Sequence, residues 1–156
     1  MDLHTLTLRR LQGLGLAELE QLYGRPGEVA LPAGCFAGHH LRWLRTPGAR
    51  HPLWRPAEAL LFQRTPFGVD FARRRWFFWR RELGLGRFTP SAGPSRWRDT
   101  DTIRLDYEVS RLPGPLRGLL YDEVRPLSGT LCLGLGGINA PRGRGDHFFF
   151  ALQRIG

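Results

Sequence analysis

Residues 121–125 (YDEVR) hold the densest group of side chains that could do chemistry. If they form a strand, alternation places Tyr121, Glu123 and Arg125 on one face and Asp122 on the other. Glu123 and Arg125 could then form an inward ion pair that grips a polar ligand, or Glu123 could act as a general base. The alternative is a salt bridge at a strand edge on the surface, which would contribute little to stability.

Tyr107 could add a hydroxyl to the same interior. Residues 102–110 alternate strictly between apolar and polar side chains, which predicts one wet and one buried face. Tyr107 falls on the buried face, where a phenol can bury its ring and still use its hydroxyl.

His147 is a further candidate, because it begins a segment that is apolar on both faces. It could be the lone axial ligand of a haem, or a histidine at the barrel rim that bonds to Asp146 or to the backbone. The other histidines considered, His39, His40 and His51, match no standard metal-ligand spacing, and adjacent histidines on a strand point to opposite faces. We therefore expect no metal and no cofactor.

The glycine-rich run LGLGG, residues 133–137, does not predict a dinucleotide site. A third glycine would fall at Asn139, and no helix follows. The run is typical of a strand whose leucines fill one face and whose other face, with Cys132, Gly134 and Gly136, is thin. If the thin face points into a barrel it leaves room for a ligand, and if it points outward it lets a helix pack closely.

The block RRRWFFWRR, residues 73–81, mixes arginines and aromatic rings as single-strand nucleic-acid platforms do. The favoured alternative is a strand whose aromatic rings belong to the core and whose arginines are solvated. All 23 basic residues are arginine, the net charge is +9, and the arginines are dispersed along the chain. A coding bias explains this pattern better than selection for phosphate contacts, so we do not expect nucleic acid as the partner.

The elements that must position these side chains are a helical amino-terminal segment, within residues 1–28, and a β domain over residues 29–156. Apolar spacing predicts helix over residues 5–24, and a further short helix near Pro56. Turn residues separate the strands. The predicted strands are residues 35–44, 69–71, 75–79, 83–89, 102–110, 121–125, 130–138 and 147–155, with 91–94 and 111–120 as connections.

The chain of 156 residues is long enough for a single domain with its own core and too short for two ordinary domains. Two cysteines, Cys35 and Cys132, lack CxxC spacing and are expected to be reduced. The amino terminus lacks the pattern of a signal peptide, and no window is apolar enough to span a membrane. We therefore expect a cytoplasmic protein.

The carboxy-terminal third, residues 101–155, resembles bacterial calycin-like (lipocalin-like) proteins of unassigned function. The resemblance lies in an apolar strand with a tyrosine, a D-E-V-R segment, the strand PLSGTLCLG and the terminal FFFAL strand. It implies a small antiparallel β-barrel with an interior cavity, and no established activity. The early glycine-tryptophan signature of many calycins is present only as GCFAG, residues 34–38, without the tryptophan.

Together these observations predict a mainly β protein, an antiparallel calycin-like barrel of eight to ten strands. The leading hypothesis is binding, or non-redox conversion, of a hydrophobic small molecule inside the barrel. Its candidate polar groups are Tyr107, Glu123, Arg125 and His147. The alternatives are a basic module that contacts an acidic partner or nucleic acid, and a haem protein.

Overall fold

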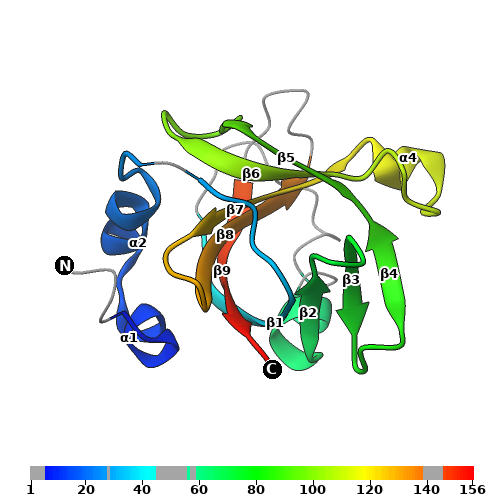
Figure 1. The fold of residues 1–156 in the computed structure, drawn as a ribbon, viewed down its shortest axis with the longest axis horizontal. Helices are drawn as coiled ribbons and strands as arrows, with labels where there is room; N and C mark the ends of the chain where they lie inside the picture. Colours follow the sequence, from blue (N-terminus) through cyan, green and yellow to red (C-terminus); the bar gives the residue numbers. More distant parts are fainter. Residues whose placement is uncertain (1–5, 28, 45–55, 57–58, 139–145) are drawn as a thin grey trace.

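The computed structural model describes residues 6–27, 29–44, 56, 59–138 and 146–156. Within this part of the chain, nine antiparallel strands form one sheet that curls into a nearly closed barrel (Figure 1). The strands are β1 Cys35–Trp43, β2 Phe67–Asp70, β3 Arg75–Phe78, β4 Gly84–Arg87, β5 Thr89–Pro94, β6 Asp101–Asp106, β7 Leu120–Pro126, β8 Leu131–Ile138 and β9 Asp146–Arg154. The helical elements are α1 Leu8–Gly13, α2 Leu16–Tyr23, the π-helix η2 Leu60–Arg64 and α4 Gly114–Arg117. The prediction of a mainly β antiparallel barrel is confirmed.

The two edges of the sheet are consecutive in the chain. The strand order is β4-β3-β2-β1-β9-β8-β7-β6-β5, so β4 and β5 lie at opposite ends, yet Phe88 alone separates them. The backbone N–H of Phe88 donates to the carbonyl of Arg74 at 3.0 Å. Phe88 therefore links the two edge strands of the sheet directly.

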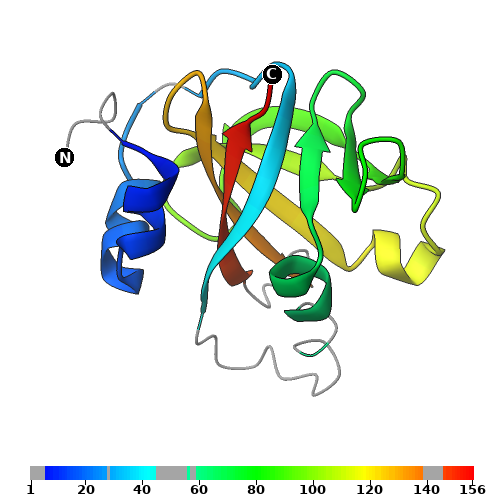
Figure 2. The ribbon, with the colours of Figure 1, turned by 90° about the horizontal axis from the view of Figure 1, so that it is seen from below.

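The sheet is covered on both faces around β9. One apolar cluster fills the barrel interior and includes Phe148, Phe150 and Leu152, while the alternate residues Phe149 and Ala151 belong to a second cluster on the outer face. The second cluster also contains leucines of α1 and α2, because these helices pack beside the barrel (Figure 2). This explains why the last strand is apolar on both faces, as predicted.

The thin face of β8 points into the barrel, but it leaves no empty space there. A Cβ on Gly134 would lie 2.2 Å from Cζ of Phe150, and one on Gly136 would lie 2.6 Å from Cζ of Phe148. The missing side chains of β8 therefore make room for two phenylalanine rings of the neighbouring strand. At this level the barrel is a packed core.

Several local predictions are wrong for identifiable reasons. Residues 91–94 belong to the edge strand β5, which tolerates its prolines because its outer side pairs with no strand among the described residues. Val109 is 57% exposed because β6 ends at Asp106 and a turn follows. The predicted strand over residues 35–44 does not alternate throughout, because a register shift after His40 pairs His40 with Phe150 of the interior and Arg42 with Phe149 of the outer face. The short helix predicted near Pro56 is found as the helical residues Pro56 and Ala59 and the π-helix η2, while residues 52–55, 57 and 58 lie outside the described residues.

Candidate functional site

A chain of hydrogen bonds in the barrel interior joins β3, the residue that follows β6, and β7. The indole N–H of Trp76 on β3 donates to the hydroxyl of Tyr107 at 2.5 Å, and this hydroxyl donates to the Asp122 carboxylate on β7. Trp76 and Tyr107 are 4% and 5% exposed and belong to the interior cluster. Burial, followed by the charge of Asp122, raises the pKa of Tyr107 well above its usual range.

The strand register places Asp122 in one layer with aromatic residues. Asp122 pairs with Gly136, Gly136 with Phe148, and Phe148 with Trp43 across neighbouring strands. Below this layer, toward the other end of the barrel, the interior cluster continues through apolar side chains such as Val124 and Phe36. The interior polar groups described here are therefore gathered at one end, which we call the Tyr107 end.

His40 belongs to the Tyr107 end as well. Its ring stacks on Phe148 with a centroid distance of 5.5 Å and lies 4.8 Å from the ring of Trp43. Burial, helped by the nearby charge of Arg42, lowers the pKa of His40 to about 4. The imidazole is thus neutral at physiological pH, and its Nε2 has no hydrogen-bond partner among the described residues.

Two surface cavities of the described structure flank the segment that follows Tyr107. The larger, about 410 Å³, is lined by Tyr107 itself, together with Arg96, Asp106, Glu108, Arg117, Gly118, Leu120 and Tyr121. The smaller, about 290 Å³, is lined by Arg75, Gly84, Leu85, Gly86, Arg87, Ser110, Arg111 and Leu112. Gly86 adopts φ +68° and lies against Tyr107, since a Cβ there would be 3.6 Å from its ring. The tyrosine therefore separates the packed interior from both cavities.

Glu123 lies on the opposite face of β7, where it contacts Tyr23 of α2 and the start of the loop over residues 95–100. This carboxylate is fully buried, and four donors from the described residues reach it. The hydroxyls of Tyr23 and Tyr121 donate at 2.9 Å each, the Ser95 hydroxyl at 2.5 Å and the backbone N–H of Arg96 at 2.6 Å. We call these five residues the Glu123 cluster. Because each carboxylate oxygen accepts two hydrogen bonds, the buried charge is well compensated.

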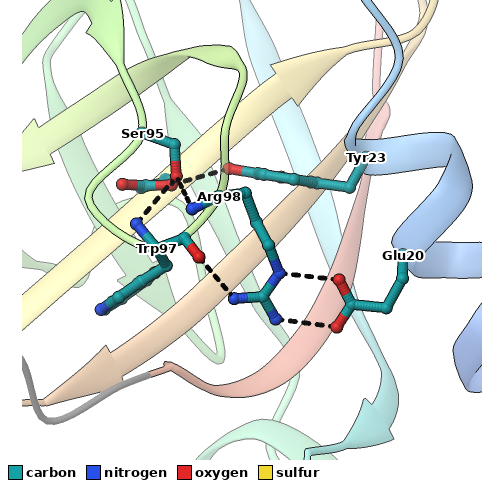
Figure 3. Close-up of polar contacts among 6 residues, drawn as sticks. Glu20, Tyr23, Ser95, Trp97 and Arg98 are labelled. Carbon is teal, nitrogen blue, oxygen red and sulfur yellow. Dashed lines mark hydrogen bonds and ion pairs between the residues drawn. The ribbon is translucent and has the colours of Figure 1, made fainter.

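The Glu123 cluster fixes the rim of the larger cavity. Its bond to the Arg96 backbone holds the start of the 95–100 loop, and the Arg96 guanidinium lies 4.3 Å from the centroid of the Tyr121 ring. The loop is also tied to α2, since Arg98 makes two hydrogen bonds of 2.7 Å to the carboxylate of Glu20 (Figure 3). Glu123 is therefore a positioning residue for a cavity that it does not line.

The prediction that Glu123 and Arg125 form an inward ion pair is wrong. They share a face of β7, as alternation predicted, but this face is turned toward the outer cluster and α2. Arg125 instead donates from Nη1 to the hydroxyl of Thr100 at 2.7 Å and to the carbonyl of Asp101 at 2.6 Å. The alternative of a surface salt bridge is also wrong, since both side chains are buried.

His147 is buried and lies on β9, three strands away from β6. A register shift between Gly136 and Gly137 makes it the extra residue on its strand, and its carbonyl accepts from the N–H of Leu44 at 2.7 Å. Of the four predicted site residues, Tyr107 lines one of the two cavities described above, and Glu123, Arg125 and His147 line neither of them. The described residues contain no group of three potential metal ligands, and Cys35 and Cys132 are free thiols. His51 lies outside the described residues.

Sequence reasoning missed Asp122 and Trp76 as partners of Tyr107. The signal was present for Asp122, because alternation separates it from Glu123 and places it on the face of Val124. For Trp76 the aromatic block gave no indication of which of its rings would meet a hydroxyl.

Comparisons with known proteins give this chain no family. No family model matches it, and no curated protein matches it either. A crystal structure of a protein from Thermomonospora curvata is similar over 92% of this chain and 89% of that chain, with a TM-score of 0.49 and 15% sequence identity. No helix among the described residues is both long enough and apolar enough to cross a membrane.

Proposed function

We propose that this protein binds a small, largely hydrophobic molecule at the Tyr107 end of its barrel. One observation carries the proposal: the Trp76–Tyr107–Asp122 chain stands at the border between an aromatic interior and the 410 Å³ cavity. Small-molecule sites usually combine apolar side chains with a few convergent polar groups. Here the apolar side chains belong to the interior cluster behind Tyr107, while charged residues make up half of the cavity lining. The resemblance to calycin-like proteins supports the same proposal.

The side chains around the cavities favour a ligand with an acidic group. In the larger cavity two acidic residues, Asp106 and Glu108, match Arg96 and Arg117, and Asp106 forms an ion pair of 3.4 Å with Arg96. The excess of positive charge that favours an acidic group therefore belongs to the smaller cavity. Three arginines line the smaller cavity beside two leucines, and no acidic residue lines it. A carboxylate or sulfonate could bind the guanidinium groups while an apolar body contacts the leucines and the tyrosine ring.

Binding is favoured over conversion. A general acid or base works best when its pKa lies near the working pH, but burial raises the pKa of Tyr107 and lowers that of His40 to about 4. Neither group is therefore well suited to transfer a proton at neutral pH. Both remain suitable for holding a ligand by hydrogen bonding and ring contact.

A fluorescence titration with 1-anilinonaphthalene-8-sulfonate tests the proposal, because this probe joins an apolar ring system to a sulfonate. We expect saturable binding that Arg117→Gln weakens by roughly tenfold or more, the effect of losing a hydrogen bond to a charged group of about 1.5 kcal/mol. Arg117 and Arg9 are both exposed, and Arg9 lies on α1, so Arg9→Gln is the matched control and should bind the probe as the wild type does.

The variant Tyr107→Phe tests the same site independently of Arg117 and has its own control. Removing this hydroxyl should weaken probe binding by roughly threefold to tenfold. Ser128→Ala removes a half-buried, hydrogen-bonded hydroxyl from the turn between β7 and β8, which lines neither cavity, and should leave the affinity unchanged, with far-UV circular dichroism verifying that both variants fold. Equal affinities for wild type, Arg117→Gln and Tyr107→Phe would contradict the proposed site.

A further inference from the structure

The hairpin of β3 and β4 presents large apolar side chains to solvent. Trp79, Leu83 and Leu85 are 60%, 52% and 54% exposed, within seven consecutive residues. The preceding aromatic residues of the same block are not available, since Trp76 and Phe77 are 4% and 7% exposed. The prediction that Trp79 would fill a face of the core is therefore wrong.

The backbone at Trp79 is strained, and hydrogen bonds of the hairpin hold it in this conformation. Its φ is +60°, in the left-handed region that a bulky side chain rarely adopts. The Trp79 N–H donates to the carbonyl of Pro66 at 2.8 Å, and the Phe78 N–H donates to the carbonyl of Leu83 at 3.3 Å. Such strain persists where the surroundings impose it and is concentrated at functional positions.

Arginines surround these apolar side chains. Residues 73–87 contain six arginines and one acidic residue, Glu82. Arg80 and Arg81 are exposed and lie between Trp79 and Leu83 in the chain. The hairpin therefore combines an interfacial aromatic residue, an aliphatic residue and positive charge at one tip.

We propose that this hairpin tip, residues 79–83, docks the protein on an anionic lipid surface. Tryptophan prefers the boundary between headgroups and acyl chains, leucine inserts beside it, and guanidinium groups bind lipid phosphates. The net charge of +9 adds a general attraction to an anionic surface. This docking does not depend on the small-molecule site, because none of residues 79–83 lines either cavity.

Nucleic acid fits the hairpin tip less well than a lipid surface does. A single-strand platform needs several exposed rings on which successive bases stack. Trp79 is the one aromatic residue of the block that is mostly exposed, and aliphatic Leu83 offers no stacking face. The exposed apolar side chains fit acyl chains better than bases.

Sedimentation with vesicles tests the docking. We expect the full chain to bind phosphatidylcholine vesicles that contain phosphatidylserine, to bind pure phosphatidylcholine vesicles much more weakly, and to dissociate as salt rises. Arg80→Gln with Arg81→Gln should reduce the partition coefficient about 25-fold, at roughly fivefold for each arginine. Trp79→Ser should reduce it roughly tenfold or more. Leu31→Ser is the matched control, because Leu31 is 51% exposed outside the hairpin.

Insertion of Trp79 has a signature of its own. Vesicles with brominated acyl chains should quench part of the tryptophan fluorescence of the wild type. Trp79→Phe should still bind these vesicles but lose the quenching that arises at the hairpin tip, because Trp43, Trp76 and Trp97, the other tryptophans among the described residues, lie outside residues 79–83. Absence of binding to anionic vesicles, binding that the hairpin substitutions leave unchanged, or binding to a single-stranded oligonucleotide in place of vesicles would overturn the proposal.

Discussion

Replacing Glu123 by glutamine keeps the volume of the side chain and removes its charge from the centre of the Glu123 cluster. Hydrogen bonds to a charged group contribute about 1.5–3 kcal/mol each and neutral ones about 0.5–1.5. Two donors keep the amide oxygen through weaker bonds, and the two donors that face the new NH2 group must be hydroxyls that turn to accept from it, so each of the four contacts loses about 1 kcal/mol. The lower cost of burying a neutral amide offsets part of this loss. We expect Glu123→Gln to lower the free energy of unfolding by about 2–3 kcal/mol.

Urea unfolding, followed by circular dichroism, measures this loss directly, and a thermal scan should show a fall in Tm of about 4–12 °C for a chain of this size. Asp99→Asn is the matched control, since Asp99 is exposed in the same loop; its effect should stay within about 0.5 kcal/mol. In a double-mutant cycle, Tyr23→Phe should cost less in the Glu123→Gln background than in the wild type. If Glu123→Gln and Asp99→Asn had the same free energy of unfolding, the stabilising role of the Glu123 cluster would be refuted.

The remaining predictions concern the barrel interior. The pKa of His40 lies at about 4 in the fold and near 6.5 in the unfolded chain, so the unfolded chain binds more protons between these values, and the associated stability, complete above pH 6.5, is lost as pH falls toward 4. His40→Gln should therefore lose less stability than the wild type over this range in parallel urea titrations, and identical pH profiles would show that His40 is not buried as described. Gly134→Ala should destabilise the barrel by about 1–3 kcal/mol, because the new Cβ would lie 2.2 Å from the Phe150 ring. Part of this loss should return in Gly134→Ala with Phe150→Leu, and a fully stable Gly134→Ala protein would contradict the packing.

The strands could be predicted from the sequence wherever one face alone is buried. Strict alternation around Ile103 and Leu105 indicated which side of β6 faces the interior, and both are fully buried there. Alternation also grouped Glu123 with Arg125 correctly. It could not say which face of β7 is the interior, because α2 covers the other face with its own apolar cluster.

Other features depend on contacts that alternation does not encode. The register shift after His40 depends on how β1 pairs with β9, and it turns Arg42 away from the interior. The thin face of β8 was predicted, but its occupants, Phe148 and Phe150, were not, since their identity follows from the register between β8 and β9. The Tyr107 end also needs Trp76 from β3, a residue 31 positions away in the chain.

The carboxy-terminal third does not supply the interior alone. Phe36, Val69, Trp76 and Phe88 come from the earlier strands and share the interior cluster with Ile103 and the strands that follow. This is the physical reason that the resemblance, which covers residues 101–155, predicted the barrel but gave little information on its contents.

The central claim is that a small molecule binds at the Tyr107 end of the barrel, and an NMR titration with 1-anilinonaphthalene-8-sulfonate tests it most directly. The account predicts a shift of the Trp76 indole N–H, which donates to Tyr107, and of the Leu105 methyl groups, since Leu105 pairs with Asp122. The methyl groups of Leu133 and Leu135, which belong to the outer cluster, should remain unchanged. Shifts of the outer leucines with no change at Trp76 would contradict the account.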